Sequence, residues 1–177
     1  MGFRGVLMTR EYRLTCQLWI PLPLEKIFPF FSDAGNLSRI TPPWLKFTIR
    51  TPGDILMRDG TLIDYTINWL RLPIRWKTRI AMYNPPRQFR DEQLQGPYLK
   101  WVHTHRFWPE DHGTVIFDEV LYRLPLGSLG VLAHHLVVRR QLTEIFTFRQ
   151  RVIPELLLGD QSIKARLMEP VTIHRQA

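Results

Sequence analysis

The stretch YLKWVHTHRFWPEDHGTVIFDEVLYRLP, residues 98–125, decides the fold, because it reads as two strands joined by a turn around residues 109–113. Trp101, His103, His105 and Phe107 have the same parity, and strand side chains of one parity share a face. Two histidines therefore share the face of the aromatic residues. A polar pair on an aromatic strand face predicts either a lined cavity or a metal site.

Five further strands precede this stretch. The first four are predicted by apolar residues that alternate with polar ones, and in the fifth Phe89, Asp91 and Gln93 share one parity. The five strands cover residues 10–20, 45–49, 63–69, 74–80 and 89–93. Residues 70–73 make a hairpin connection, and two short helices at 24–33 and 36–40 follow the first strand. The chain is thus expected to form seven antiparallel strands joined mostly by hairpins.

A helical pattern fills residues 128–152, and its apolar face changes direction along the way. Leu129, Leu132 and Leu136 mark the first face, whereas Leu142 and Phe146 mark a face rotated by roughly half a turn at 3.6 residues per turn. We therefore predict a break in the helix near residues 138–140.

Composition favours one globular domain without a membrane-spanning segment. The chain has 177 residues, of which 45% are hydrophobic, 12% aromatic and 23% charged. No apolar run approaches the roughly 20 residues of a spanning helix, and the first residues lack the pattern of a secretory signal. The single cysteine, Cys16, falls on an apolar strand face and is expected to be reduced and buried. These features predict a cytoplasmic protein.

The net charge of +8 invites a nucleic-acid interpretation, but the distribution of the charge does not support it. Basic residues are spread over 71–79, 139–140 and 149–151, with no long basic run and no nucleotide-binding motif. We predict neither nucleic-acid binding nor integral membrane association.

The order of strand, two short helices, six strands and a long final helix is that of the helix-grip fold, and four motifs make the resemblance specific. The motifs comprise Phe89, Asp91, Gln93, Gly96, Pro97 and Tyr98; Trp101, His103, His105 and Phe107; Gly113, Thr114, Asp118, Val120 and Tyr122; and Phe146 with Arg149. In these motifs the chain resembles the SRPBCC superfamily (START and birch-pollen-allergen relatives), among them polyketide cyclase-like and CoxG-like bacterial ligand-binding members.

The resemblance implies an α+β helix-grip fold, in which a seven-stranded curved antiparallel sheet wraps the long C-terminal helix. The expected division of the chain is an N-terminal extension at 1–9, the helix-grip domain at 10–157 and a C-terminal tail at 158–177. The space between sheet and helix is commonly a cavity in this fold. We expect the cavity to be lined by Tyr65, Trp69, Trp76, Gln93, Trp101, His103, His105, Asp118, Phe146 and Arg149.

The leading functional hypothesis is a protein that binds a hydrophobic small molecule (lipid-like, isoprenoid or aromatic) for storage, transport or sensing. It assigns no catalytic residue, no metal and no cofactor. One alternative is a cyclase or dehydratase that uses the cavity histidines as acid and base. Another is a regulatory domain for an epimerase-like partner, because some relatives are fused to such a domain.

The polar residues leave several interpretations open. The two histidines can be neutral members of a hydrogen-bonded core network, or they can bind a metal with Asp118 or Glu119 as the third ligand. Arg149 lies in an apolar stripe and needs a carboxylate or carbonyl partner, which an aspartate could supply. Whether Asp118 faces the core is not decided by parity, because both faces of its strand are largely apolar.

Overall fold

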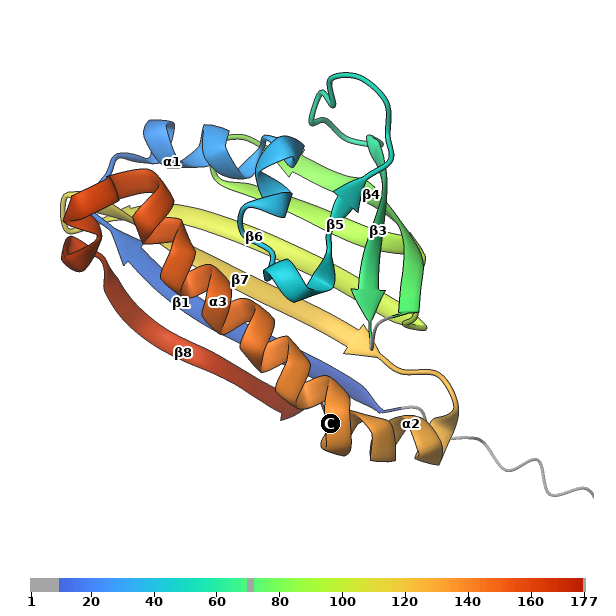
Figure 1. Ribbon diagram of the computed structural model, residues 1–177. Helices are drawn as coiled ribbons and strands as arrows, with labels where there is room; N and C mark the ends of the chain where they lie inside the picture. Colours follow the sequence, from blue (N-terminus) through green and yellow to red (C-terminus); the bar gives the residue numbers. More distant parts are fainter. Residues whose placement is uncertain (1–9, 70–71, 177) are drawn as a thin grey trace, which may run out of the picture.

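The computed structural model describes residues 10–69 and 72–176, and its largest element is one antiparallel sheet (Figure 1). The predicted extension at 1–9 and residues 70–71 of the predicted connection lie outside the described residues. Within the described part of the chain, the sheet has eight strands in the spatial order β2-β3-β4-β5-β6-β7-β1-β8. They are β1 Glu11–Ile20, β2 Thr48–Ile49, β3 Leu62–Trp69, β4 Leu72–Asn84, β5 Gln88–Gln95, β6 Lys100–Glu110, β7 Gly113–Arg123 and β8 Arg166–Arg175.

The predicted hairpin of the deciding stretch is confirmed. β6 and β7 pair from Lys100 opposite Arg123 to Glu110 opposite Gly113. The two residues between the strands, Asp111 and His112, have φ values of 49° and 59°, which suit a tight two-residue hairpin turn. The continuous ladder sets the register that brings the polar residues of neighbouring strands together.

The eighth strand corrects the prediction of seven strands followed by a tail. β8 pairs antiparallel with β1, and the pairing is irregular between Thr15 and Gln17, opposite the segment that holds Pro170. Proline cannot donate to a ladder and is confined to edges and bulges. β8 is mostly exposed and carries this proline, so it lacks the alternation by which the other strands were found.

Helices precede β2 and follow β7. The predicted helices at 24–33 and 36–40 appear as α1 Leu24–Phe31 and the 3₁₀ turn η1 Ala34–Ser38. A further 3₁₀ turn, η2 Pro43–Leu45, occupies the start of the predicted strand 45–49. Lys46 then adopts a left-handed φ of 44°, so that β2 begins only at Thr48.

The predicted break in the final helix is a π-helical turn. The helix comprises α2 Gly127–Ala133, the π turn η3 His134–Val138 and α3 Arg139–Leu158, after which the 3₁₀ turn η4 Gly159–Lys164 leads to β8. A π turn inserts residues into the helical repeat and so rotates the face that follows. Leu129, Leu132 and Leu136, which mark the first apolar face, are exposed.

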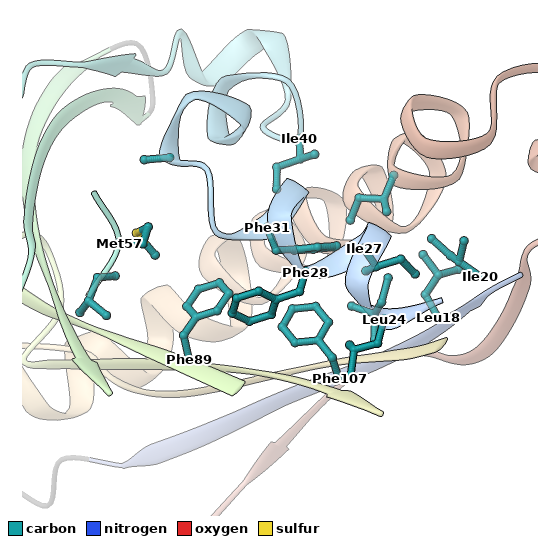
Figure 2. Packing of buried hydrophobic residues seen from close by; sticks show 14 of the residues in the cluster. Leu18, Ile20, Leu24, Ile27, Phe28, Phe31, Ile40, Met57, Phe89 and Phe107 are labelled. Atoms are coloured by element: carbon teal, nitrogen blue, oxygen red, sulfur yellow. The ribbon is translucent and has the colours of Figure 1, made fainter. Parts of the chain in front are cut away.

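α3 runs across one face of the sheet, and α1 lies near its C-terminal end (Figure 1). The core has two parts. The first packs α1 between the sheet and Ile153 of α3, with Phe28 against the rings of Phe89 and Phe107 (Figure 2). The second packs the N-terminal half of α3 on β1 and β7 through Tyr12, Leu14, Cys16, Val120, Tyr122, Val138, Leu142 and Phe146.

Two of the basic residues on the outer face of β4 are paired with acids. Lys77 lies 3.4 Å from Asp64, and Arg79 lies 3.1 Å from Glu92. Among the described residues, no helix has the length and apolar character needed to cross a membrane.

Candidate functional site

A cavity of about 370 Å³ lies between the sheet, α3 and the short helices. Small-molecule pockets have volumes of about 300–1,000 Å³ and are mainly apolar, with a few polar groups that orient the ligand. This cavity fits that description. Most of its wall is aliphatic or aromatic, including Phe31, Phe47, Ile63, Ile67, Ile80, Phe89, Leu142 and Ile145.

The five aromatic residues predicted for the cavity all line it: Tyr65, Trp69, Trp76, Trp101 and Phe146. Tyr65 stacks on Trp76 with ring centroids 5.9 Å apart, and Trp101 meets Trp76 edge-on at 5.4 Å. The indole Nε1 of Trp69 donates a hydrogen bond to Gln141 Oε1 of α3, so that β3 and the helix are joined at the cavity wall. Strand alternation was sufficient to place Tyr65, Trp69, Trp76 and Trp101 on the inner face, whereas Phe146 lies on α3.

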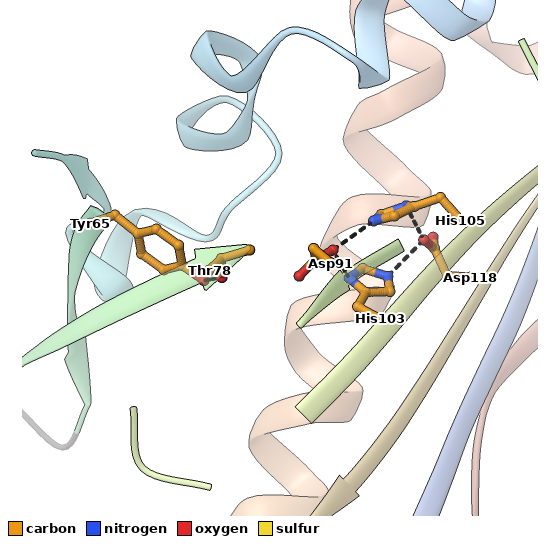
Figure 3. A network of polar contacts seen from close by, with 6 residues as sticks. All are labelled: Tyr65, Thr78, Asp91, His103, His105 and Asp118. Carbon is orange, nitrogen blue, oxygen red and sulfur yellow. Dashed lines mark hydrogen bonds and ion pairs between the residues drawn. The ribbon is translucent and has the colours of Figure 1, made fainter. Parts of the chain in front are cut away.

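A cluster of two aspartates and two histidines forms the polar part of this region (Figure 3). The register of the sheet builds it, because Asp91 of β5 lies opposite His103 of β6, and His105 of β6 lies opposite Asp118 of β7. Asp91, His103 and His105 line the cavity, whereas Asp118 lies behind them against a small space under Arg149. Asp118 therefore faces inward, which parity had not decided.

One oxygen of Asp118 contacts both imidazole rings. His103 Nε2 is hydrogen-bonded to Asp118 Oδ1 at 2.9 Å, and His105 Nδ1 lies 2.8 Å from the same oxygen, although out of line for a good hydrogen bond. Asp91 Oδ2 faces the other nitrogen of each ring, at 3.7 Å from His103 Nδ1 and 3.5 Å from His105 Nε2. The two rings are thus held between two carboxylates.

Burial and charge give the two histidines different acidities. Burial, together with the neighbouring His105, lowers the pKa of His103 to about 4, so His103 is neutral at pH 7. Burial also acts to lower the pKa of His105, but the adjacent Asp118 and Asp91 outweigh it and raise that pKa. Burial acts to raise the pKa of Asp118, yet the facing histidines hold it well below its usual value, so this carboxylate stays ionised.

Of the residues predicted to line the cavity, Asp118 lies behind its wall, and Gln93 and Arg149 have other partners than expected. Gln93 does not line the cavity: its amide nitrogen donates to Tyr98 O at 2.7 Å and its amide oxygen accepts from Tyr98 N at 3.3 Å, so it holds the turn before β6. Arg149 lines the cavity but does not form the expected ion pair among the described residues. Its guanidinium lies over the Phe146 ring, 5.3 Å from the centroid.

Sequence reasoning missed the part of the wall that comes from the segments between β1 and β3. Phe31, Ala34, Leu37, Ile40, Leu45, Phe47 and Met57 belong to this set. An apolar residue in a short helix or loop carries a signal for burial, but no periodicity shows whether it packs in the core or borders a space. No pattern in the sequence distinguishes these two roles.

No protein-family model matches the chain, and no sequence among curated proteins matches it. Solved structures match it in fold. Norcoclaurine synthase from Thalictrum flavum, in complex with dopamine and hydroxybenzaldehyde, has a TM-score of 0.61 and 16% identity, over 88% of this chain and 95% of that one. Major latex-like protein 151 from Panax ginseng has a TM-score of 0.60 and 12% identity, over 84% of this chain and 99% of that one.

A nucleoside-diphosphate sugar epimerase from Corynebacterium glutamicum also matches, with a TM-score of 0.57 and 23% identity. The match covers 84% of this chain but 30% of the epimerase, so it concerns one part of that protein. At these identities the comparisons establish the fold alone. They confirm the predicted helix-grip fold, which this chain shares with these structures.

Proposed function

We propose that the protein binds a hydrophobic small molecule (lipid-like, isoprenoid or aromatic) in the cavity between the sheet and α3. The observation that carries this proposal is a space of about 370 Å³ with apolar walls and one polar cluster. A natural core is packed to crystal-like density, and unfilled apolar space costs stability in proportion to its volume. A ligand would recover that loss, and the polar cluster would orient its polar end.

A helix-grip protein with bound small molecules supports the same use of the space. Norcoclaurine synthase is described in complex with two small aromatic compounds, dopamine and hydroxybenzaldehyde. For the present chain we propose storage, transport or sensing of such a molecule in the cytoplasm. The buried single thiol of Cys16 is consistent with a reducing compartment, where disulfides are rare.

Native mass spectrometry of the purified protein, followed by extraction and identification of bound compounds, tests the proposal. Ile67 on β3 lines the cavity, so the variant I67W fills part of it and is expected to lose the co-purified compound. Leu62 lies on the same strand but is exposed, and L62W is the matched control that should retain the compound. The proposal would be contradicted if both variants carried the same amount of compound per chain, or if the wild-type protein carried no bound compound.

An enzyme is the second candidate, and the contact of both histidines with carboxylates is the observation that favours it. A histidine whose pKa is tuned by a neighbouring carboxylate can act as a general acid or base in a cyclase or dehydratase. Conversion of the identified compound by the wild type, lost in H105Q while the compound still binds, would favour catalysis. Unchanged compound after prolonged incubation would favour simple binding.

An epimerase-like partner receives no support beyond the shared fold, because the epimerase match is 23% identical. We therefore propose the protein as a binding module in its own right, with the small molecule as its partner.

A further inference from the structure

Three atoms of metal-ligand type converge at the polar part of the cavity. They are Asp91 Oδ2, His103 Nδ1 and His105 Nε2, and all lie within 4.8 Å of one another (Figure 3). They come from the adjacent strands β5 and β6. Rigid neighbouring strands hold such atoms more precisely than loops do.

The distances within this group suit an ion better than a direct hydrogen bond. Asp91 Oδ2 lies 3.5 Å from His105 Nε2 and 3.7 Å from His103 Nδ1. Hydrogen bonds between such atoms are about 2.7–3.2 Å long. Two ligands bound tetrahedrally to Zn²⁺, at about 2.0–2.1 Å each, lie roughly 3.3 Å apart. Both distances to Asp91 Oδ2 are within a few tenths of an ångström of that value, and His103 Nδ1 and His105 Nε2 lie within 4.8 Å of each other, so small movements of the side chains would bring all three atoms to one ion.

Asp118 orients both rings for this role. It contacts His103 Nε2 and His105 Nδ1, the nitrogens that face away from Asp91. Protons placed on the Asp118 side leave the lone pairs of both rings directed towards the Asp91 carboxylate. Facing acceptors repel one another unless a proton, as in a charged His105, or a metal cation lies between them. A carboxylate behind a metal-binding histidine is the usual arrangement in protein metal sites, since it fixes the tautomer and raises the basicity of the ring.

The other candidate ligands lie elsewhere. Glu119 is directed to the outer face, where it pairs with Arg13 at 2.9 Å and Arg106 at 3.7 Å. Burial raises the pKa of the Cys16 thiol, so that it stays protonated and does not supply a thiolate. The set of potential ligands is therefore two imidazoles and one carboxylate, with Asp91 in the place that sequence reasoning considered for Asp118 or Glu119.

We propose that Asp91, His103 and His105 bind one divalent first-row transition-metal ion, of the class of Zn²⁺ or Fe²⁺, with Asp118 as the positioning residue for both rings. Two histidines and one carboxylate suit these ions and leave coordination positions free. Because the three ligands line the cavity, the free positions face it. An oxygen of a small molecule in the cavity could bind there. The ion itself does not depend on that molecule, so this proposal and the proposed function can fail separately.

The test is a metal titration of the tag-free, chelator-treated protein. Zn²⁺ and Co²⁺ are titrated by calorimetry and by competition with a chromophoric chelator, and the visible spectrum of the Co²⁺ form reports on its coordination. We expect one ion per chain and a Co²⁺ spectrum distinct from that of the aqueous ion. D91N and H105Q should each weaken Zn²⁺ binding at least tenfold. D118N, which touches only the far side of the rings, should weaken it by about 10–100-fold.

The matched control is H135Q, which removes an exposed histidine on η3 and should bind Zn²⁺ within twofold of the wild type. Near-ultraviolet circular dichroism of each variant shows whether the core is intact. The proposal is overturned if wild-type protein and folded D91N bind Zn²⁺ equally, or if Co²⁺ keeps its aqueous spectrum in the presence of the wild type. In that case the cluster is a buried network held together by protons alone.

Discussion

At the scale of single residues, Asp118 connects the polar cluster to the core. Its side chain is buried, and a single oxygen contacts both histidines. A buried carboxylate is tolerated only when its charge is compensated and its oxygens accept hydrogen bonds. The two rings provide that compensation, which explains why a charged residue can occupy the inner face of β7 between Ile116 and Val120.

The substitution D118N tests how much the ionised Asp118 carboxylate contributes to the stability of the folded protein. An asparagine amide keeps the shape of the side chain but removes the charge and offers only one acceptor. Loss of a hydrogen bond to a charged group costs about 1.5–3 kcal/mol, and we expect a decrease of this size in the free energy of unfolding. Urea denaturation in metal-free buffer at pH 7 measures it. The exposed Asp54 supplies the control D54N, which should change stability by less than about 0.5 kcal/mol.

A D118N protein as stable as the wild type would show that the cluster contributes no net stability.

The residues of the site also show how far side-chain positions could be predicted from the sequence. Alternation identified His103 and His105 as inward-facing, and the structure agrees. Neither the hydrogen bonds of Gln93 with Tyr98 nor the position of the Arg149 guanidinium over Phe146 could be predicted, because both depend on side-chain geometry rather than on periodicity.

At the scale of elements, the strands and the break in the final helix could be predicted because each is encoded by a local period. β8 could not, since an exposed edge strand needs no alternation and Pro170 weakens its pattern further. The predicted break at residues 138–140 lies close to the observed π turn at His134–Val138, but the π-helical form of the break was not predictable. That form depends on packing around His134, which is buried where the helix meets β1 and β7.

We expect His134 to make the π turn sensitive to acid. Its ring stacks on Tyr12 with centroids 3.6 Å apart, and Nε2 lies 2.8 Å from the hydroxyl of Tyr122. Burial, with help from His135 and Arg139, lowers the pKa of His134 to about 4 from the ordinary 6.5. Between these values the unfolded chain binds a proton that the folded protein excludes. The contribution of a neutral His134 is therefore complete above pH 6.5 and is lost as the pH falls towards 4.

The variant H134Q should flatten this pH dependence, since glutamine keeps a polar partner for Tyr122 and does not titrate. Between pH 6.5 and 4, the wild type should lose up to about 1.4 kcal/mol per pH unit more than the variant, which corresponds to one proton. Urea denaturation at half-unit intervals of pH measures both slopes. Above pH 7 the two curves should run parallel. Equal slopes throughout the acid range would show that His134 is not the group responsible.

At the scale of the whole molecule, the cavity borders two packed regions. One is built on α1 and the C-terminal end of α3, and the other on the N-terminal half of α3, with the cavity wall drawing residues from both. Because residues of several strands and helices form its wall, the cavity follows from the fold rather than from a local packing fault. Selection for stability alone would fill it with larger side chains, and such cavity-filling substitutions commonly stabilise proteins at the expense of function.

Removal of the bound compound should consequently destabilise the protein. A ligand that binds only the folded state stabilises it by RT ln(1 + [L]/Kd), which is about 2.7 kcal/mol when the free ligand concentration is one hundred times Kd. Protein stripped on a hydrophobic resin should therefore unfold at a lower urea concentration than the protein as purified, and addition of the extracted compound should restore the original stability.

The variant I67W, whose cavity is partly filled, should unfold at the same urea concentration with or without the compound. L62W should behave like the wild type. If I67W gained as much stability from the compound as L62W did, the compound would be bound outside the cavity, because only a ligand inside it competes with the new indole for the same space.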